Sequence, residues 1–332
     1  MTAMHDLVEY MKKKAKKKKC TIIVAEGWDE RCLKASASVL AGGYANLILL
    51  GDEKKIKDEA KKFKADIKGA VIINPKTYKE RKKLAQELYE LRKHKGMTPS
   101  EADKLLDDVN YFGCMLLHTE KADGLAGSAI CSTAELMRPA LQIIKTKPDA
   151  TLVSETIMME DTKKKRVLFL TDCSLNPDPT VEELAQMGVN AADCAASFGF
   201  EPRVAFLSYS TKGSGGTSPT IEKTLKAVEL ARKKNKEYVF DGEFQGDAAI
   251  NPYAAGRKCP NALIKGDANV LVFPNLTTAN IVCHLLMQLS DSKLGMGMLM
   301  GIRKPVIILG RSTPLETVEN LIINCAMKAN VE

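Results

Sequence analysis

The chain has 332 residues, more than one hydrophobic core usually serves, so two domains are expected. Hydrophobic residues make up 45% of the chain and charged residues 27%, a balance that excludes a disordered protein. The longest apolar runs, such as residues 269–273, are much shorter than the about 20 residues of a membrane-spanning helix. Residues 1–11 lack the apolar centre of an export signal. We therefore expect a soluble cytoplasmic protein with no membrane partner.

The net charge of +8 is concentrated near the N-terminus, where seven lysines lie within residues 12–19. They follow Leu7, Val8 and Met11, a pattern that predicts the exposed face and the end of one helix. Nucleic-acid binding is the alternative interpretation, but no stacking aromatics or known binding motif accompany the lysines. We expect no nucleic-acid partner.

The nine cysteines contain no Cys-x-x-Cys pair, so their spacing predicts neither a zinc site nor a disulfide framework. Reduced thiols and no bound metal are expected. Cys173 could suggest a covalent thioester, but in an Ala-rich chain a packing role is favoured.

Short β-branched apolar runs alternate with amphipathic helical segments along the whole chain, as in α/β proteins. The predicted strands are residues 21–25, 46–50, 70–73, 111–117, 151–157, 167–170, 204–209, 238–241, 269–273 and 305–309. The predicted helices include residues 29–40, 180–190 and 221–230, and Thr180 and Glu183 have the spacing of a capping box. The alternation predicts two α/β domains with mostly parallel sheets. The first comprises residues 1–148 plus 300–332, and the second residues 149–299.

Residues 122–147 contain a candidate anion site. Gly124 and Gly127 are expected in a turn, and three hydroxyl residues follow it: Ser128, Ser132 and Thr133. Pro139 suits the first turn of a helix, which would place Arg138 just ahead of the helix N-terminus. A guanidinium in that position favours an anion. An ion pair with a surface carboxylate is the open alternative.

Two more segments have polar residues after a predicted strand. Residues 205–219 run from a strand into a glycine-rich turn typical of phosphate sites, although steric needs alone also produce such turns. Its candidate binding residues are Ser210, Thr211, Lys212, Gly213 and Ser214. Residues 241–250 place Asp241, Glu243 and Asp247 where open α/β sheets hold ligands; solvated loop acids are the alternative.

Two further arginines differ in their setting. Arg92 lies in a basic helical stretch, which usually means a solvated face, whereas Arg311 closely follows an apolar strand.

These segments resemble the phosphate acetyltransferase family over nearly the whole chain. The resemblance rests on six segments in the family's order: YELRKHKGMT (89–98), ADGLAGSA with RPALQIIKT (122–146), DCSLNPDPTVEELA (172–185), LSYSTKGS (207–214), DGEFQGDAAI (241–250) and DANVLVFPNLTTANI (267–281). It implies a two-domain α/β subunit, usually a homodimer, with the active site in the cleft between the domains. It also implies reversible exchange of acetyl-CoA and phosphate with acetyl phosphate and CoA by direct thiolate attack in a ternary complex. No permanent cofactor is implied, because coenzyme A is a substrate.

The resemblance makes Arg92, Arg138 and Arg311 the substrate arginines, with Arg311 next to the reacting phosphate. Ser128, Ser132, Thr133, the 210–214 loop and Asp247 would position substrates.

The chain departs from the family at the thiol-activating carboxylate, where Thr317 stands, and the neighbouring Glu316 becomes the candidate acid. Gly310, Asn275 and Met300 also differ from the family's usual residues. A phosphate butyryltransferase-like enzyme and a non-catalytic acyl-CoA-sensing module are the alternatives.

Overall fold

The computed structural model describes residues 4–148, 150–161, 164–289 and 293–330. The chain forms two compact units. Residues 8–146 and 302–332 form the first, called here the outer unit, and residues 147–301 with the start of the chain up to Leu7 form the second, the central unit. Each unit contains one sheet flanked by helices, so the predicted α/β class with mostly parallel sheets is confirmed.

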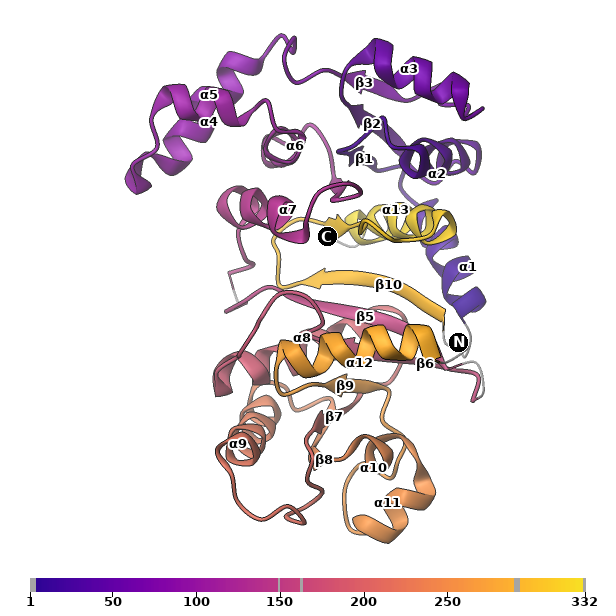
Figure 1. The fold of residues 1–332 in the computed structure, drawn as a ribbon, viewed down its shortest axis with the longest axis vertical. Coiled ribbons are helices and arrows are strands. Elements are labelled where there is room, and N and C mark those ends of the chain that lie inside the picture. The colour runs from indigo at the N-terminus through magenta and orange to yellow at the C-terminus, as the bar shows by residue number, and fades with distance from the viewer. Residues whose placement is uncertain (1–3, 149, 162–163, 290–292, 331–332) are drawn as a thin grey trace. The chain divides into compact units, whose positions relative to one another are not determined.

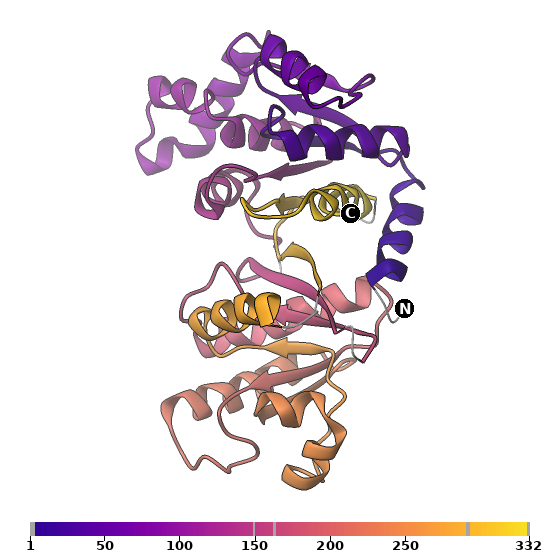
Figure 2. The same cartoon turned by 45° about the vertical axis from the view of Figure 1, so that its right-hand side comes forward.

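The outer unit has a sheet of five parallel strands in the order β11-β4-β1-β2-β3 (Figure 1). Its strands are β1 (Thr21–Val24), β2 (Asn46–Leu50), β3 (Val71–Ile73), β4 (Gly124–Gly127) and β11 (Val306–Ile308). Its helices are α2 (Glu30–Ala41), α3 (Glu53–Lys62), α4 (Arg81–Arg92), α5 (Pro99–Leu105), α6 (Val109–His118), α7 (Thr133–Pro139) and α13 (Leu315–Ala329), with most of α1 (Met4–Ala15), the 3₁₀ turn η1 (Lys93–Lys95) and the π turn η2 (Ala140–Ile144). Helices α2 and α13 pack together (Figure 2).

The central unit has a six-stranded sheet in the order β10-β5-β6-β9-β7-β8. Strands β6, β9, β7 and β8 are parallel, and β5 and β10 extend the sheet antiparallel. The strands are β5 (Ser154–Asp161), β6 (Arg166–Thr171), β7 (Arg203–Leu207), β8 (Val239–Phe244), β9 (Val270–Val272) and β10 (Lys293–Met300). The helices are α8 (Val181–Ser197), α9 (Pro219–Lys234), α10 (Gly246–Ile250), α11 (Pro252–Lys258) and α12 (Leu276–Leu289).

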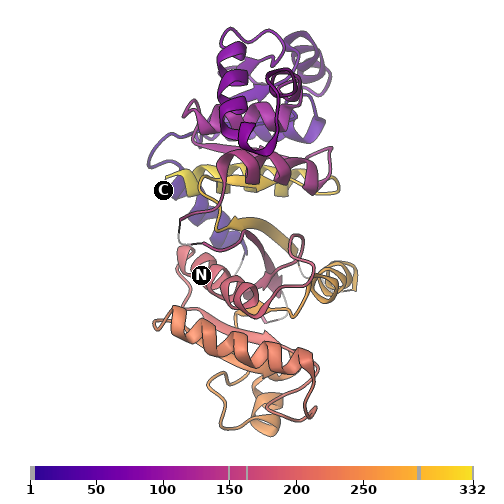
Figure 3. The same ribbon diagram turned by 90° about the vertical axis from the view of Figure 1, so that its left-hand side faces the viewer.

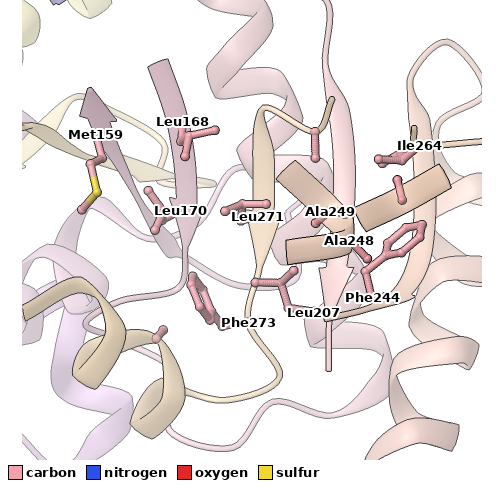
Figure 4. Close-up of a cluster of buried hydrophobic side chains, with 14 of the residues drawn as sticks. Met159, Leu168, Leu170, Leu207, Phe244, Ala248, Ala249, Ile264, Leu271 and Phe273 are labelled. Atoms are coloured by element: carbon pink, nitrogen blue, oxygen red, sulfur yellow. The ribbon is translucent and has the colours of Figure 1, made fainter. Parts of the chain in front are cut away.

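Alternate side chains of the central strands enter two separate cores, because neighbouring residues of a strand face opposite sides of its sheet. Leu168 and Leu170 belong to the core beneath α10 and α12, which Figure 4 shows. Phe169 faces the other core, where its ring meets Phe200 edge-on at 5.3 Å between centroids. Figure 3 shows α8 and α12 on opposite sides of this sheet.

Local signals in the sequence account for several helix starts. Asp29 caps α2 by accepting from the amides of Arg31 and Cys32. The capping box of Thr180 and Glu183 is present at the start of α8 and is confirmed.

The strand predicted at residues 111–117 is wrong. Residues 111–117 form most of α6, not a strand, and the helix begins where Asp108 accepts from the amides of Asn110 and Tyr111. Residues 110–117 are buried all round, so α6 lacks the polar face that marks a helix in a sequence.

The turn predicted at Gly124 and Gly127 is also wrong, because these residues begin and end strand β4. A Cβ on Gly124 would lie 2.6 Å from Cys325 Sγ, so this buried strand requires a residue without a side chain. Strand β10 is absent from the prediction. Among the described residues, no helix has the length and apolar character needed to span a membrane.

Candidate active site

The candidate site of the outer unit lies at the carboxyl ends of β1, β4 and β11, three adjacent parallel strands. Open α/β sheets bind ligands at this edge. Two turns form it, the 128–131 turn between β4 and α7 and the 310–313 turn between β11 and α13. The second turn carries Arg311, and the first leads directly into the helix that carries Arg138.

Arg31, in the first turn of α2, ties the two turns together. Its Nη1 donates to the carbonyl oxygens of Gly310 at 3.1 Å, Arg311 at 3.0 Å and Thr313 at 3.2 Å. Its Nη2 donates to the carbonyl oxygen of Ala129 at 2.6 Å. The planar, always-charged guanidinium suits this role because several donors are held in one rigid fork. Arg31 therefore sets the position of Arg311 relative to the 128–131 turn.

Arg138 and Arg311 both expose their side chains, and neither guanidinium has a hydrogen bond or an ion pair to any residue that the structure describes. Both nevertheless lie close to one carboxylate. Glu135 has a lowered pKa, because the Ser132 hydroxyl and amide bond to it first and the charges of Arg311 and Arg138 add to the effect. The two cations thus lie near the same carboxylate without forming an ion pair with it.

The local placement predicted for Arg138 is wrong. Arg138 lies in the last turn of α7, not ahead of a helix N-terminus, because the helix already begins at its Ser132 cap. Pro139 is the last residue of α7 instead of its first, and the backbone continues as the π turn η2. The missing N–H of a proline disfavours a regular α-helix at that point.

Arg92 lies beside a pocket of about 760 Å³ in the same unit, next to Tyr111 and Gln142. The Tyr111 hydroxyl donates to Gln142 Oε1 at 3.1 Å. Burial raises the pKa of Tyr111, while the charges of Arg138 and Arg92 oppose that shift, so both arginines lie near its ring. The Nε atom of Arg92 is shielded from solvent and has no hydrogen-bond partner. An unsatisfied buried donor at a pocket is available to a ligand.

The hydroxyl residues predicted in this region are used within the protein. Ser128 is buried in the left-handed region at φ 66°, and its Oγ donates to the carbonyl oxygen of Cys131 at 3.1 Å. Ser132 caps α7 through a capping box with Glu135. Thr133 is the first residue of that helix and is half-buried.

Glu316, the candidate acid, is exposed in the first turn of α13, and Thr317 follows it half-buried. A one-residue step rotates a helical side chain by about 100°. The side chain of Glu316 therefore projects from α13 in a different direction from that of Thr317.

In the central unit, the 210–214 loop is held by buried carboxylates. Glu243 accepts from the Ser210 hydroxyl and the Gly213 amide, each at 2.8 Å. Lys212 donates to Asp241 at 2.7 Å, and its ammonium lies 5.0 Å from the ring centroid of Phe244. Burial would raise the pKa of Asp241, but the hydrogen bond and charge of Lys212 outweigh it and lower the pKa.

The backbone amides of residues 211–216 also donate inwards. Their acceptors lie within the loop or on Glu243. Ser210 and Thr211 are buried, whereas Ser214 is exposed. The loop is thus a rigid turn whose amides are already engaged, in contrast to the open amide cradle of a phosphate-binding loop.

Asp247 lies in the first turn of α10 and forms an ion pair with Lys258 at 2.8 Å. That hydrogen bond is the main reason for its lowered pKa. The sequence predicted that Asp241 and Glu243 lie at or after the end of a strand. In the structure both lie inside β8.

The sequence profile of the phosphate acetyl/butaryl transferase family matches residues 6–326. A phosphate acetyltransferase from Staphylococcus aureus (strain Mu50) is 42% identical over 330 residues, which cover 98% of this chain and 99% of that protein. One from Clostridium acetobutylicum is 38% identical and covers 98% of each chain. The crystal structure of a phosphotransacetylase from Streptococcus pyogenes covers 99% of each chain at 38% identity, with a TM-score of 0.93.

The chain belongs to the phosphate acetyl/butaryl transferase family. The resemblance drawn from its sequence motifs and the acyltransferase class are confirmed.

Two residues at the site of this family member were missed in the sequence. Arg31 and Glu26 belong to the segment EGWDER, at residues 26–31, directly after β1. Four charged side chains and a glycine at the carboxyl end of a strand are a local signal of a ligand site. This segment lies ahead of the six family segments, the first of which begins at residue 89.

Proposed function

We propose that the chain is a phosphate acetyltransferase, which exchanges an acetyl group between coenzyme A and inorganic phosphate. The observation that carries the proposal is the pair of exposed, unpaired guanidiniums of Arg138 and Arg311 beside Glu135. Exposed cations without a carboxylate partner suit a dianionic substrate, and arginine binds phosphate oxygens through forked hydrogen bonds. The relatives carry the same name along their whole length.

In the proposed reaction, the thiolate of coenzyme A attacks the carbonyl carbon of acetyl phosphate. A carbon–sulfur bond forms, the carbon–oxygen bond to phosphate breaks, and phosphate leaves with the electron pair. Arg311 and Arg138 would hold the phosphate and stabilise the negative charge that develops on the carbonyl oxygen. Arg92, with its unpartnered Nε at the 760 Å³ pocket, would hold a phosphate of coenzyme A.

The proton of the thiol needs an acceptor, since a thiol with a pKa of about 8.5 is mostly protonated at neutral pH. Glu316 is the proposed acceptor, five residues after Arg311 and exposed. Glu316→Gln should lower the rate near neutral pH and recover it at higher pH, where the thiolate forms unaided. An unchanged pH profile would exclude this role.

Ser128, Ser132, Thr133, the 210–214 loop and Asp247 are proposed to act mainly by positioning, because most of their polar groups already bond within the protein. The Ser214 hydroxyl accepts from the Thr211 amide at 2.9 Å, but its side chain is exposed and its O–H remains a donor for a substrate.

The decisive assay follows thiol release from acetyl-CoA with and without phosphate. Arg311→Ala and Arg138→Ala should each lower kcat/KM by about 100-fold or more, the loss typical of one oxyanion donor. Arg257→Ala, at an exposed arginine of α11, is the matched control and should retain wild-type turnover. Normal turnover in both site variants would refute the assignment. Comparing acetyl-, propionyl- and butyryl-CoA tests the acyl group.

We also propose a cytoplasmic homodimer. Helix α12 exposes Ile281, Leu285 and Leu289 by 52%, 51% and 81%, at the spacing of one helical face. An apolar ridge of this kind suits a self-complementary contact about a two-fold axis. Light scattering should give the mass of a dimer, and Leu285→Lys should give that of a monomer. An unchanged mass in the variant would exclude α12 as the contact.

A further inference from the structure

Glu26 is a buried carboxylate with an incomplete set of partners. It lies just beyond the end of β1 and is 1% exposed. The Cys131 thiol donates to its Oε1 at 3.4 Å, and its Oε2 has no hydrogen-bond partner. Burial raises its pKa, and the nearby backbone amides of Ala129, Ile130 and Glu26 itself, with the Cys131 thiol, oppose that shift. Three of these four opposing groups belong to the 128–131 turn.

The 128–131 turn has few other supports. Ser128 bonds back to the carbonyl oxygen of Cys131, Asn110 Nδ2 donates to Cys131 Sγ at 3.5 Å, and Arg31 holds the Ala129 carbonyl. Ser128 also has a left-handed backbone, which costs free energy for a residue other than glycine. A turn in this conformation persists only when its surroundings hold it.

The backbone that presents Glu26 is itself closely packed. Gly27 follows it, and a Cβ there would lie 2.9 Å from both Leu49 Cβ and the carbonyl oxygen of Leu50. The Gly27 amide also donates to the Leu50 carbonyl at 3.1 Å. The backbone next to Glu26 is therefore held in place against β2.

We infer that Glu26 is a positioning residue: its carboxyl holds the 128–131 turn and thereby sets the start of α7, the helix that carries Arg138. The turn runs directly into Ser132, the cap of that helix, and Glu135 in the first turn lies near both site arginines. A buried carboxyl is costly to keep, and a turn built on it moves when it is removed. The kinetic part of this inference rests on the proposed function.

The first test measures the turn directly, by hydrogen exchange of peptides that span residues 124–138. Glu26→Ala should speed exchange of the backbone amides in the 128–131 turn by about 10-fold or more, the equivalent of one lost hydrogen bond between Glu26 and the turn. Glu26→Gln keeps an oxygen acceptor at the same reach and should restore most of the protection. Val39→Ala is the control: it removes buried methyl groups from α2, so it lowers stability without touching the turn.

The second test is kinetic. Glu26→Ala should raise the KM for phosphate by about 10-fold or more while the KM for acetyl-CoA changes little, because Arg92 lies on a different helix. Glu26→Gln should recover phosphate binding, and Val39→Ala should lower the melting temperature with both KM values unchanged.

The inference is overturned by unchanged exchange in Glu26→Ala, by a glutamine variant as impaired as alanine, or by equal losses for both substrates. A wild-type protein without phosphate-dependent thiol release refutes the proposed function instead. In that case the hydrogen-exchange result still decides whether Glu26 holds the turn.

Discussion

A single buried glutamate should make the stability of the central unit depend on pH. Glu155, near the start of β5, is 7% exposed, and burial raises its pKa from an ordinary 4.5 to about 7. The nearby Ser174 hydroxyl opposes the shift, and the nearby Asp172 adds to it. The folded state therefore holds this proton more tightly than the unfolded state does. Stability must then fall as the pH rises from the lower value to the higher one.

The size of the effect follows from those two pKa values. Between pH about 5.5 and about 8, the unfolded carboxyl is almost fully ionised, while the folded one changes from mostly protonated to mostly ionised. Integrating the difference in bound protons gives a loss of about 2 kcal/mol in the free energy of unfolding over this interval. Glu155→Gln cannot ionise and should not show this loss, so its stability relative to wild type should rise by about 2 kcal/mol across the same interval.

Urea unfolding at the two pH values, with hydrogen exchange of peptides from β5 and β6, measures this difference in the central unit. Glu237→Gln, an exposed glutamate of the same unit, is the matched control and should follow wild type. Parallel pH dependence in wild type and Glu155→Gln would refute the reasoning, because burial would then have no effect on the proton of Glu155.

Three further outcomes are expected. Arg31→Ala removes four hydrogen bonds to backbone carbonyls and should lower the stability of the outer unit by about 3 kcal/mol. The fluorescence of Trp28 during urea unfolding measures this loss, and an unchanged transition would contradict the role of Arg31 in joining the two turns. Burial raises the pKa of Cys131 to about 11, so its alkylation should be slow at neutral pH and accelerate towards that value, and rapid neutral labelling would argue against it. Gly188→Ala places a Cβ 2.5 Å from Phe206 Cζ and should cost about 1–3 kcal/mol by thermal unfolding, whereas Gly256→Ala, with open space around it, should cost nothing.

Most of the fold could be predicted because its signals are local. Strands such as β1 and β2 are short β-branched or leucine runs, and the capping box of Thr180 and Glu183 marks the start of α8. The run at 111–117 failed because a helix buried on every side has the composition of a buried strand. Its capping residue, Asp108, was the local signal that separates the two.

The candidate site was predictable in its residue types and less so in their partners. Arginines as anion ligands follow from chemistry, and Arg138 and Arg311 do lie near one carboxylate. Lys212 and Ser210 resemble ligand groups in sequence, yet in the folded unit they bond to Asp241 and Glu243. A side chain's partner depends on which strands become neighbours, and no local pattern contains that information.

The sequence by itself determined the alternation of strands and helices, the caps and the family, because each depends on residues close together in the chain or on motifs in order. Only the tertiary structure decided that β4 must begin with a glycine, since Cys325 of a distant helix fills the space beside Gly124. It also decided that Arg31 bridges two turns far apart in the chain, at Ala129 and Thr313. Such contacts arise because parallel strands bring their carboxyl ends to one edge whatever their separation in sequence.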